Sequence, residues 1–333
     1  MPWTSRLRVR QAEGDRFLRP RRRAPAIDPS FGDPRRAGIR AAAREGAERW
    51  PEIRGRLAAA AADGEDLSFL VEGLQDVAGV ERWIGDVIAA DPGDPLPLLV
   101  SGARHVGWAW HARTGFEARH VSEGQWELFH ARLGTAEGQL LEAAEREPAW
   151  AAPWYFLQMS GRGLQVGPEV AEYRFEAVCR RAPGHAAAYR QHLQQLCRKW
   201  GGSHRQMHAF ARASMLAAPE GGRLGELVAL AHLEEWLSLG GDPESVYLGG
   251  ARVLGELYEA AGRSVFHPAF ARDRDWALAF NAFAMAFAMA GDHGAARRLF
   301  RALGNRATER PWLYLDGRSP LVPFLAWRAR VNR

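Results

Sequence analysis

Two consecutive stretches of this chain decide its fold class. Residues 148–182 read PAWAAPWYFLQMSGRGLQVGPEVAEYRFEAVCRRA, and residues 183–217 read PGHAAAYRQHLQQLCRKWGGSHRQMHAFARASMLA. A period of about 34 residues, with two helical segments and a closing proline in each unit, is typical of tetratricopeptide-like helical arrays. A shift of 35 residues superimposes residues of similar size or conformational role: Pro148 on Pro183, Ala151 on Ala186, Trp154 on Tyr189, Gly167 on Gly202 and Phe175 on Phe210.

The same pattern extends toward the C-terminus. A step of 36 residues carries Pro183 onto Pro219 and Trp200 onto Trp236. Residues 280–300 also place aromatic and small residues where the two helices of such a unit need them. The sequence has no segment long enough for a strand in which apolar and polar residues alternate, and this argues against a sheet. We therefore expect an all-α fold, a tetratricopeptide-like α-solenoid of stacked antiparallel helix pairs.

The chain divides into a short leading segment and one long domain. Residues 1–36 are rich in arginine and proline with little apolar periodicity, so we expect a largely flexible N-terminal segment. Residues 37–330 form a single helical-repeat domain, with the best-defined repeats at 148–304. Ser-x-x-Gln sequences at 122–125 and 203–206 are capping boxes that predict helix starts.

The charge of the chain is unevenly distributed. The net charge is +5, yet residues 1–50 hold 13 arginines against 6 acidic residues. The remainder holds 31 basic and 33 acidic residues, so the helical body is nearly neutral. This balance gives no support to a basic groove dedicated to nucleic acid.

Cysteine content and hydropathy indicate the compartment. Cys179 and Cys197 are 18 residues apart, with neither a CxxC motif nor zinc-type spacing, so we expect small buried side chains. This usage fits a reducing cytoplasm, which we take as the expected location. The sequence has no run of 18 or more apolar residues, and no membrane association is expected.

The turn at 199–204, Lys-Trp-Gly-Gly-Ser-His, carries a family resemblance. With its flanking residues it resembles a group of uncharacterised bacterial tetratricopeptide-like proteins, and the segments 126–130, 162–166 and 308–312 are similar to that group too. The resemblance covers roughly residues 40–330. It implies a helical-repeat fold in proteins of unknown function and supplies no active site to transfer.

Paired histidines are the main candidates for chemistry. His204 and His208 are four residues apart on a predicted helix, so they share a face and are candidate metal ligands. No HExxH motif accompanies them, and they lie at the edge of an apolar stripe where histidine is commonplace. His105 and His111 each stand three residues from Trp108, an arrangement that favours packing. We therefore expect no metal and no cofactor.

Aromatic and basic residues on the first helices and turns of the repeats suggest a binding surface. First helices line the concave face of such arrays, and aromatic and arginine side chains are good anchors for a peptide. A large aromatic residue at the fourth position of a repeat also fits the core, which is the competing interpretation of Trp154. The candidate groove residues are Trp154, Tyr155, Arg162, Arg198, Lys199 and Trp200.

These features favour a non-catalytic scaffold that binds a protein or peptide in a concave groove. Two alternatives remain open from the sequence. One is binding of RNA or an anionic ligand through the arginine-rich N-terminal segment. The other is a metal-dependent enzyme that uses the helical histidine pairs. The sequence fixes neither the partner nor the oligomeric state.

Overall fold

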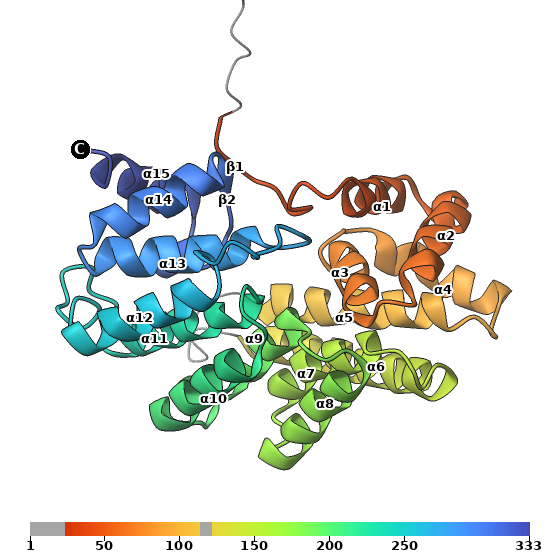
Figure 1. The fold of residues 1–333 in the computed structure, drawn as a ribbon. Helices are drawn as coiled ribbons and strands as arrows, with labels where there is room; N and C mark the ends of the chain where they lie inside the picture. The colour runs from red at the N-terminus through yellow and green to blue at the C-terminus, as the bar shows by residue number, and fades with distance from the viewer. Residues whose placement is uncertain (1–23, 114–121) are drawn as a thin grey trace, which may run out of the picture.

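The computed structural model describes residues 24–113 and 122–333, and within them the fold is all-α (Figure 1). The first half of the chain contains α1 (Pro34–Glu45), α2 (Trp50–Ala60), α3 (Gly64–Gln75), α4 (Val80–Ala90), α5 (Pro95–Arg113), α6 (Glu123–Arg146), α7 (Ala152–Leu164) and α8 (Pro168–Arg181). The second half contains α9 (Ala186–Gln195), α10 (His204–Ala217), α11 (Glu226–Ser238), α12 (Ala251–Arg263), α13 (Ala277–Met289), α14 (His293–Leu303) and α15 (Leu321–Arg330). The expected all-α class is confirmed. In the described ranges, no helix is both long enough and apolar enough to cross a bilayer.

Side-chain caps set several helix starts. Ser122 and Gln125 form both halves of the capping box predicted for α6. At the start of α10, the Ser203 hydroxyl accepts a hydrogen bond from the Gln206 amide at 3.2 Å. Asp63 accepts from two free amides at the start of α3 in the same way. These caps satisfy N–H groups that have no partner inside the helix.

Successive helices from α7 onward form hairpins. The pairs α7–α8, α9–α10, α11–α12 and α13–α14 follow one another along the chain, and the two helices of each pair are in contact. The first helix of each pair also contacts the first helix of the next, from α7 to α9, α11 and α13. The helices form an arc that runs from α1–α5 through α7–α10 to α11–α15 (Figure 1).

Helix α13 is the most deeply buried element of the second half. All of its residues except Leu278 are buried, because its sequence is apolar on every side. Its one polar residue, Asn281, is satisfied on both ends of its amide. It donates to the Ala277 carbonyl at 2.8 Å and accepts from Trp312 Nε1 at 2.7 Å. This bond fixes the segment around Trp312 against the helix.

Regular structure begins before residue 37. The strand β1 (Ala26–Ile27) pairs in parallel with β2 (Arg306–Ala307), and α1 starts at Pro34. The N-terminal end of the described chain therefore lies beside its C-terminal part (Figure 1). The remaining part of the expected flexible segment, residues 1–23, lies outside the described residues.

A buried network of ion pairs joins the two ends of the arc. Arg223, just before α11, contacts Glu65 on α3 and Asp275 before α13, with 2.6 Å between its Nη1 and the aspartate. Arg190 on α9 contacts the same Asp275 and pairs with Glu226 at 2.6 Å. Burial opposes the charged form of Asp275, but the two arginines outweigh it and lower the pKa of that carboxyl. The network ties elements that are far apart in sequence.

Replacing Arg223 with methionine should lower the free energy of unfolding by about 3 kcal/mol, because it removes one of the two arginines that neutralise buried Asp275 and the closest cationic partner of Glu65. Denaturant unfolding followed by tryptophan fluorescence measures this. Arg212→Met removes an exposed pair with Glu259 and is the matched control, for which we expect no measurable change. Equal behaviour of the two variants would contradict a structural role for the network.

His185 makes stability depend on pH. It caps α9 by accepting from the Ala188 amide at 3.2 Å, and it stacks on Tyr155. Burial lowers its pKa to about 3, so below pH 6.5 the unfolded chain takes up a proton that the folded chain refuses. Stability from this group is therefore complete above pH 6.5 and is lost as the pH falls toward 3.

His185→Asn keeps a capping side chain and removes the titration. Between pH 6.5 and pH 5, the free energy of unfolding of this variant should fall by about 2 kcal/mol less than that of the wild type. One proton bound only by the unfolded chain contributes about 1.4 kcal/mol per pH unit. His130→Asn, at an exposed position, should keep the wild-type slope. Parallel slopes for the wild type and His185→Asn would refute the burial argument.

Candidate functional site

The arc of helices encloses a groove of about 2420 Å³. Its walls come from α1, α3, α5, α6, α7, α8, α9, α10, α11 and α13, together with residues 27–31 and the turns at 196–202 and 308–314. The groove therefore depends on the whole arc and belongs to no single helix pair. Its lining mixes aromatic, basic and acidic side chains. The aromatic members are Phe31, Trp110, Trp126, Tyr155, Tyr173, Trp200 and Tyr314.

Three tryptophans and two arginines form a cluster in this lining, which we call the Trp/Arg cluster. Trp110 and Trp200 meet edge to face with their ring centroids 5.8 Å apart. The Arg113 guanidinium lies 5.6 to 5.8 Å from the rings of Trp110, Trp126 and Trp200. Arg162 lies 5.6 Å from Trp110 and 5.7 Å from Trp200. Guanidinium groups at this range are attracted to the faces of indole rings.

Arg162 is held in place by the next helix pair. Its Nη2 donates to Gln191 Oε1 at 2.9 Å, and its Nη1 donates to the Gln191 carbonyl at 3.3 Å. Burial, reinforced by the charge of Arg310, lowers the pKa of Arg162 to about 10. The guanidinium therefore still carries its charge at pH 7. The cluster offers fixed apolar surface beside a fixed positive charge.

On the α11 side of the groove stands a carboxylate that is already satisfied. Glu234 accepts from Lys199 Nζ at 2.7 Å and from Tyr314 Oη and Gln194 Nε2 at 2.6 Å each. Burial works against its charged form, but Lys199 and these hydrogen bonds outweigh that effect and lower the pKa of Glu234. Glu234 thus joins α9, the turn at 196–202 and the turn at 308–314 to α11.

Five of the six residues expected in a groove do line it. Tyr155, Arg162, Arg198, Lys199 and Trp200 all border the cavity, although Tyr155 is buried and donates to Glu72 at 2.6 Å. Trp154 lies elsewhere and is the correction to this set. It packs edge to face on Tyr173 of α8, with ring centroids 5.6 Å apart, because its position on α7 faces the partner helix.

The structure adds residues that the sequence analysis did not single out as binding candidates. Trp110, Arg113 and Trp126 come from α5 and α6, outside the clearest repeats. The sequence signal was the density of aromatic residues there, but nothing in the local spacing places them opposite Trp200. The sequence equivalence of Trp200 and Trp236 also fails in space, since Trp236 is buried in the core and donates to the Asp242 carbonyl.

The other candidate residues, His204 and His208, both turn toward Glu235 on α11. His208 Nε2 lies 2.7 Å from Glu235 Oε2, and His204 Nδ1 lies 3.4 Å from Oε1. His105 packs on Trp108, as expected, with ring centroids 5.9 Å apart. The two histidines of the pair therefore share a carboxylate that the sequence did not single out.

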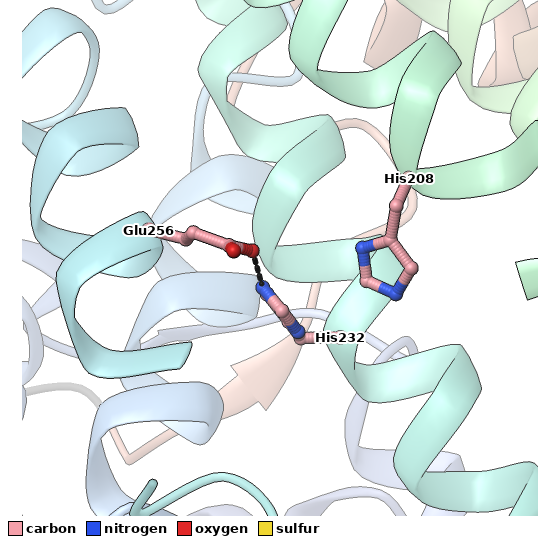
Figure 2. A group of neighbouring side chains, drawn as sticks. All are labelled: His208, His232 and Glu256. Carbon is pink, nitrogen blue, oxygen red and sulfur yellow. Dashed lines mark hydrogen bonds and ion pairs between the residues drawn. The ribbon is translucent and has the colours of Figure 1, made fainter. Parts of the chain in front are cut away.

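Two more residues that the sequence analysis missed complete this cluster. His232 on α11 is fully buried, and its Nε2 lies 2.9 Å from Glu256 Oε2 on α12 (Figure 2). The centroids of the imidazole rings of His208 and His232 are 4.7 Å apart. Burial, with a contribution from the charge of His208, lowers the pKa of His232 to about 4. No known motif spacing links residues 208, 232 and 256, so only the fold brings them together.

Arg162→Met tests whether the arginine organises the Trp/Arg cluster. We expect the free energy of unfolding to fall by about 1–2 kcal/mol, since the change removes cation–π contacts and bonds to Gln191. Near-UV circular dichroism should also weaken while the far-UV spectrum stays constant. Arg198→Met, at an exposed neighbouring position, is the control. An unchanged near-UV signal in Arg162→Met would contradict this role.

Comparison with known proteins gives no relative to extend this site. No protein-family model matches the chain, and neither the search of curated proteins nor the search of solved structures found a match.

Proposed function

We propose that this protein is a non-catalytic, tetratricopeptide-like scaffold that binds a protein or peptide segment in its central groove. The observation that carries the proposal is the size of the groove, about 2420 Å³, combined with the Trp/Arg cluster in its wall. Small-molecule sites usually enclose about 300–1,000 Å³, so the groove has room for a stretch of polypeptide.

The array part of the proposal rests on equivalent positions in successive units. Trp154 of α7 packs on Tyr173 of α8, and Tyr189 of α9 packs on Phe210 of α10 with ring centroids 5.8 Å apart. In both units a large aromatic residue of the first helix faces the second helix. Tyr189 also packs on Phe175 of α8, with ring centroids 4.9 Å apart, and this contact joins one unit to the next. Stacked units of this kind usually present a continuous concave surface.

The chemistry of the lining suits a polypeptide. Indole rings supply rigid apolar area, and arginines beside them donate hydrogen bonds to carbonyl or carboxylate oxygens. Residues of these types dominate binding energy in protein interfaces. Because Gln191 already holds Arg162, binding loses little conformational entropy at this anchor.

The mixed charge of the lining favours polypeptide over nucleic acid. Glu169, Glu172 and Glu176 of α8 all border the groove, together with basic residues on α9 and the 196–202 turn. A surface for the phosphate backbone needs neutralising cations along its length, which these carboxylates oppose.

Selection from a displayed library of random peptides on the full-length protein tests the proposal. Enriched peptides are then titrated by fluorescence anisotropy. Trp200→Ala and Arg162→Gln should each weaken binding at least about tenfold, as expected for central anchors. The failure of any peptide to enrich would contradict the proposal.

The matched controls make the same type of substitution, tryptophan to alanine or arginine to glutamine, at positions outside the groove. Trp327→Ala alters a half-buried tryptophan of α15, and Arg212→Gln alters an exposed arginine of α10. Both should bind the selected peptides like the wild type. Equal affinity of the groove variants and the controls would place binding on another surface.

A further inference from the structure

We propose that His208, His232 and Glu256 form a binding site for a divalent transition-metal ion, with Zn²⁺ the ion to test first. Each residue offers one ligand atom, and the three atoms lie within 4.8 Å of one another. They come from three helices, α10, α11 and α12, and Figure 2 shows the two imidazoles and the carboxylate turned toward a common space. Two histidines and one carboxylate are a common set of protein ligands for zinc, with water in the remaining position.

The hydrogen bonds around the cluster fix which nitrogen of each ring is free. Tyr247 Oη donates its single hydrogen to Glu235 Oε2 at 2.6 Å. It must therefore accept from His232 Nδ1, which lies 2.9 Å away. His232 Nε2 is then left with a lone pair. This nitrogen is the one that faces Glu256.

The same reasoning applies to His208. Its Nε2 lies 2.7 Å from Glu235 Oε2, so this nitrogen carries the hydrogen and donates it to the carboxylate. The Nδ1 of His208 keeps its lone pair for a ligand. A second hydrogen bond from the far nitrogen to a carboxylate or another oxygen is the usual way in which proteins orient metal-binding histidines. Both histidines of this cluster have such a bond.

No hydrogen then lies between His232 and Glu256. With the hydrogen on Nδ1, the 2.9 Å separation of His232 Nε2 and Glu256 Oε2 brings two acceptors together. Acceptors at this distance repel, and the contact lies against a fully buried ring. A cation bound by both atoms turns the repulsion into attraction. This is a second argument for an ion, independent of the ligand spacing.

The second oxygen of Glu256 is already used. Arg252 Nη1 donates to Glu256 Oε1 at 2.8 Å, one turn away on α12, and this leaves Oε2 directed toward His232. Zinc bonds of about 2.0–2.2 Å require the ligand atoms to come closer than 4.8 Å. The partly exposed side chains of His208 and Glu256 allow this movement, and they leave an open side for water.

The site is separate from the groove and from the proposed function. None of the three ligands is among the described residues that border the groove. A bound ion would join α10, α11 and α12 and so stabilise the second half of the arc. The expected consequence is an increase in the melting temperature of the metal-free protein when Zn²⁺ is added.

Purified full-length protein without an affinity tag is stripped with a chelator, dialysed, and titrated with Zn²⁺ by calorimetry. We expect one ion per chain and a rise in melting temperature. Co²⁺ should give the visible absorption of a low-symmetry nitrogen and oxygen site. Glu256→Gln and His208→Gln change partly exposed side chains and should each weaken Zn²⁺ binding more than about tenfold. Tyr247→Phe should weaken it about 10- to 100-fold, as for other residues that orient metal ligands.

His204→Gln is the matched control. His204 lies one turn from His208 and contacts Glu235 and Ser238, yet it is not a proposed ligand. This variant should bind Zn²⁺ like the wild type. No zinc uptake by the stripped wild type would overturn the proposal, since a proton would then fill the contact between His232 and Glu256. Loss of binding in His204→Gln but not in Glu256→Gln would also overturn it.

Discussion

The buried pairing of Arg190 and Arg223 with Asp275 is the interaction on which the rest of the structure depends. Asp275 precedes α13, Arg190 belongs to α9, and Arg223 leads into α11 and also contacts Glu65 on α3. A buried charge is stable only when it is fully paired. If these elements moved apart, a charge without a partner would remain in an apolar environment. The network therefore sets the distance between the two ends of the arc. The parallel pairing of β1 with β2 closes the same junction from another side.

The groove is a consequence of that closure. Trp110 and Trp126 come from the first half of the chain, Trp200 from the turn before α10, and Tyr314 from the segment that follows β2. A helical array that opened at the junction would place these groups too far apart to share one cavity. The bond between Trp312 and Asn281 adds to this, because it holds the segment next to Tyr314 against α13. Large separated parts of the sequence thus meet at one surface with a defined shape.

Helix α11 connects the groove with the histidine cluster. Glu234 faces the groove and accepts from Lys199 and Tyr314, while His232 and Glu235 face α10 and α12. Residues two apart on a helix point to different sides, so one short segment serves both surfaces. An ion at the cluster would fix α11 from behind and so hold Glu234 in place. The two sites differ in chemistry, yet they share this mechanical support.

The sequence by itself determined the helical class, the start of α6 and the helix pairs of the second half. Those features follow from local patterns, since helix periodicity, capping and repeat spacing act over a few turns. Only the tertiary structure decided that Trp154 faces α8, that Trp110 meets Trp200, and that His232 and Glu256 join His208. Such contacts depend on the angle between helices and on how the arc closes. Packing and buried charge over the whole chain fix those quantities, and no short stretch of sequence contains them.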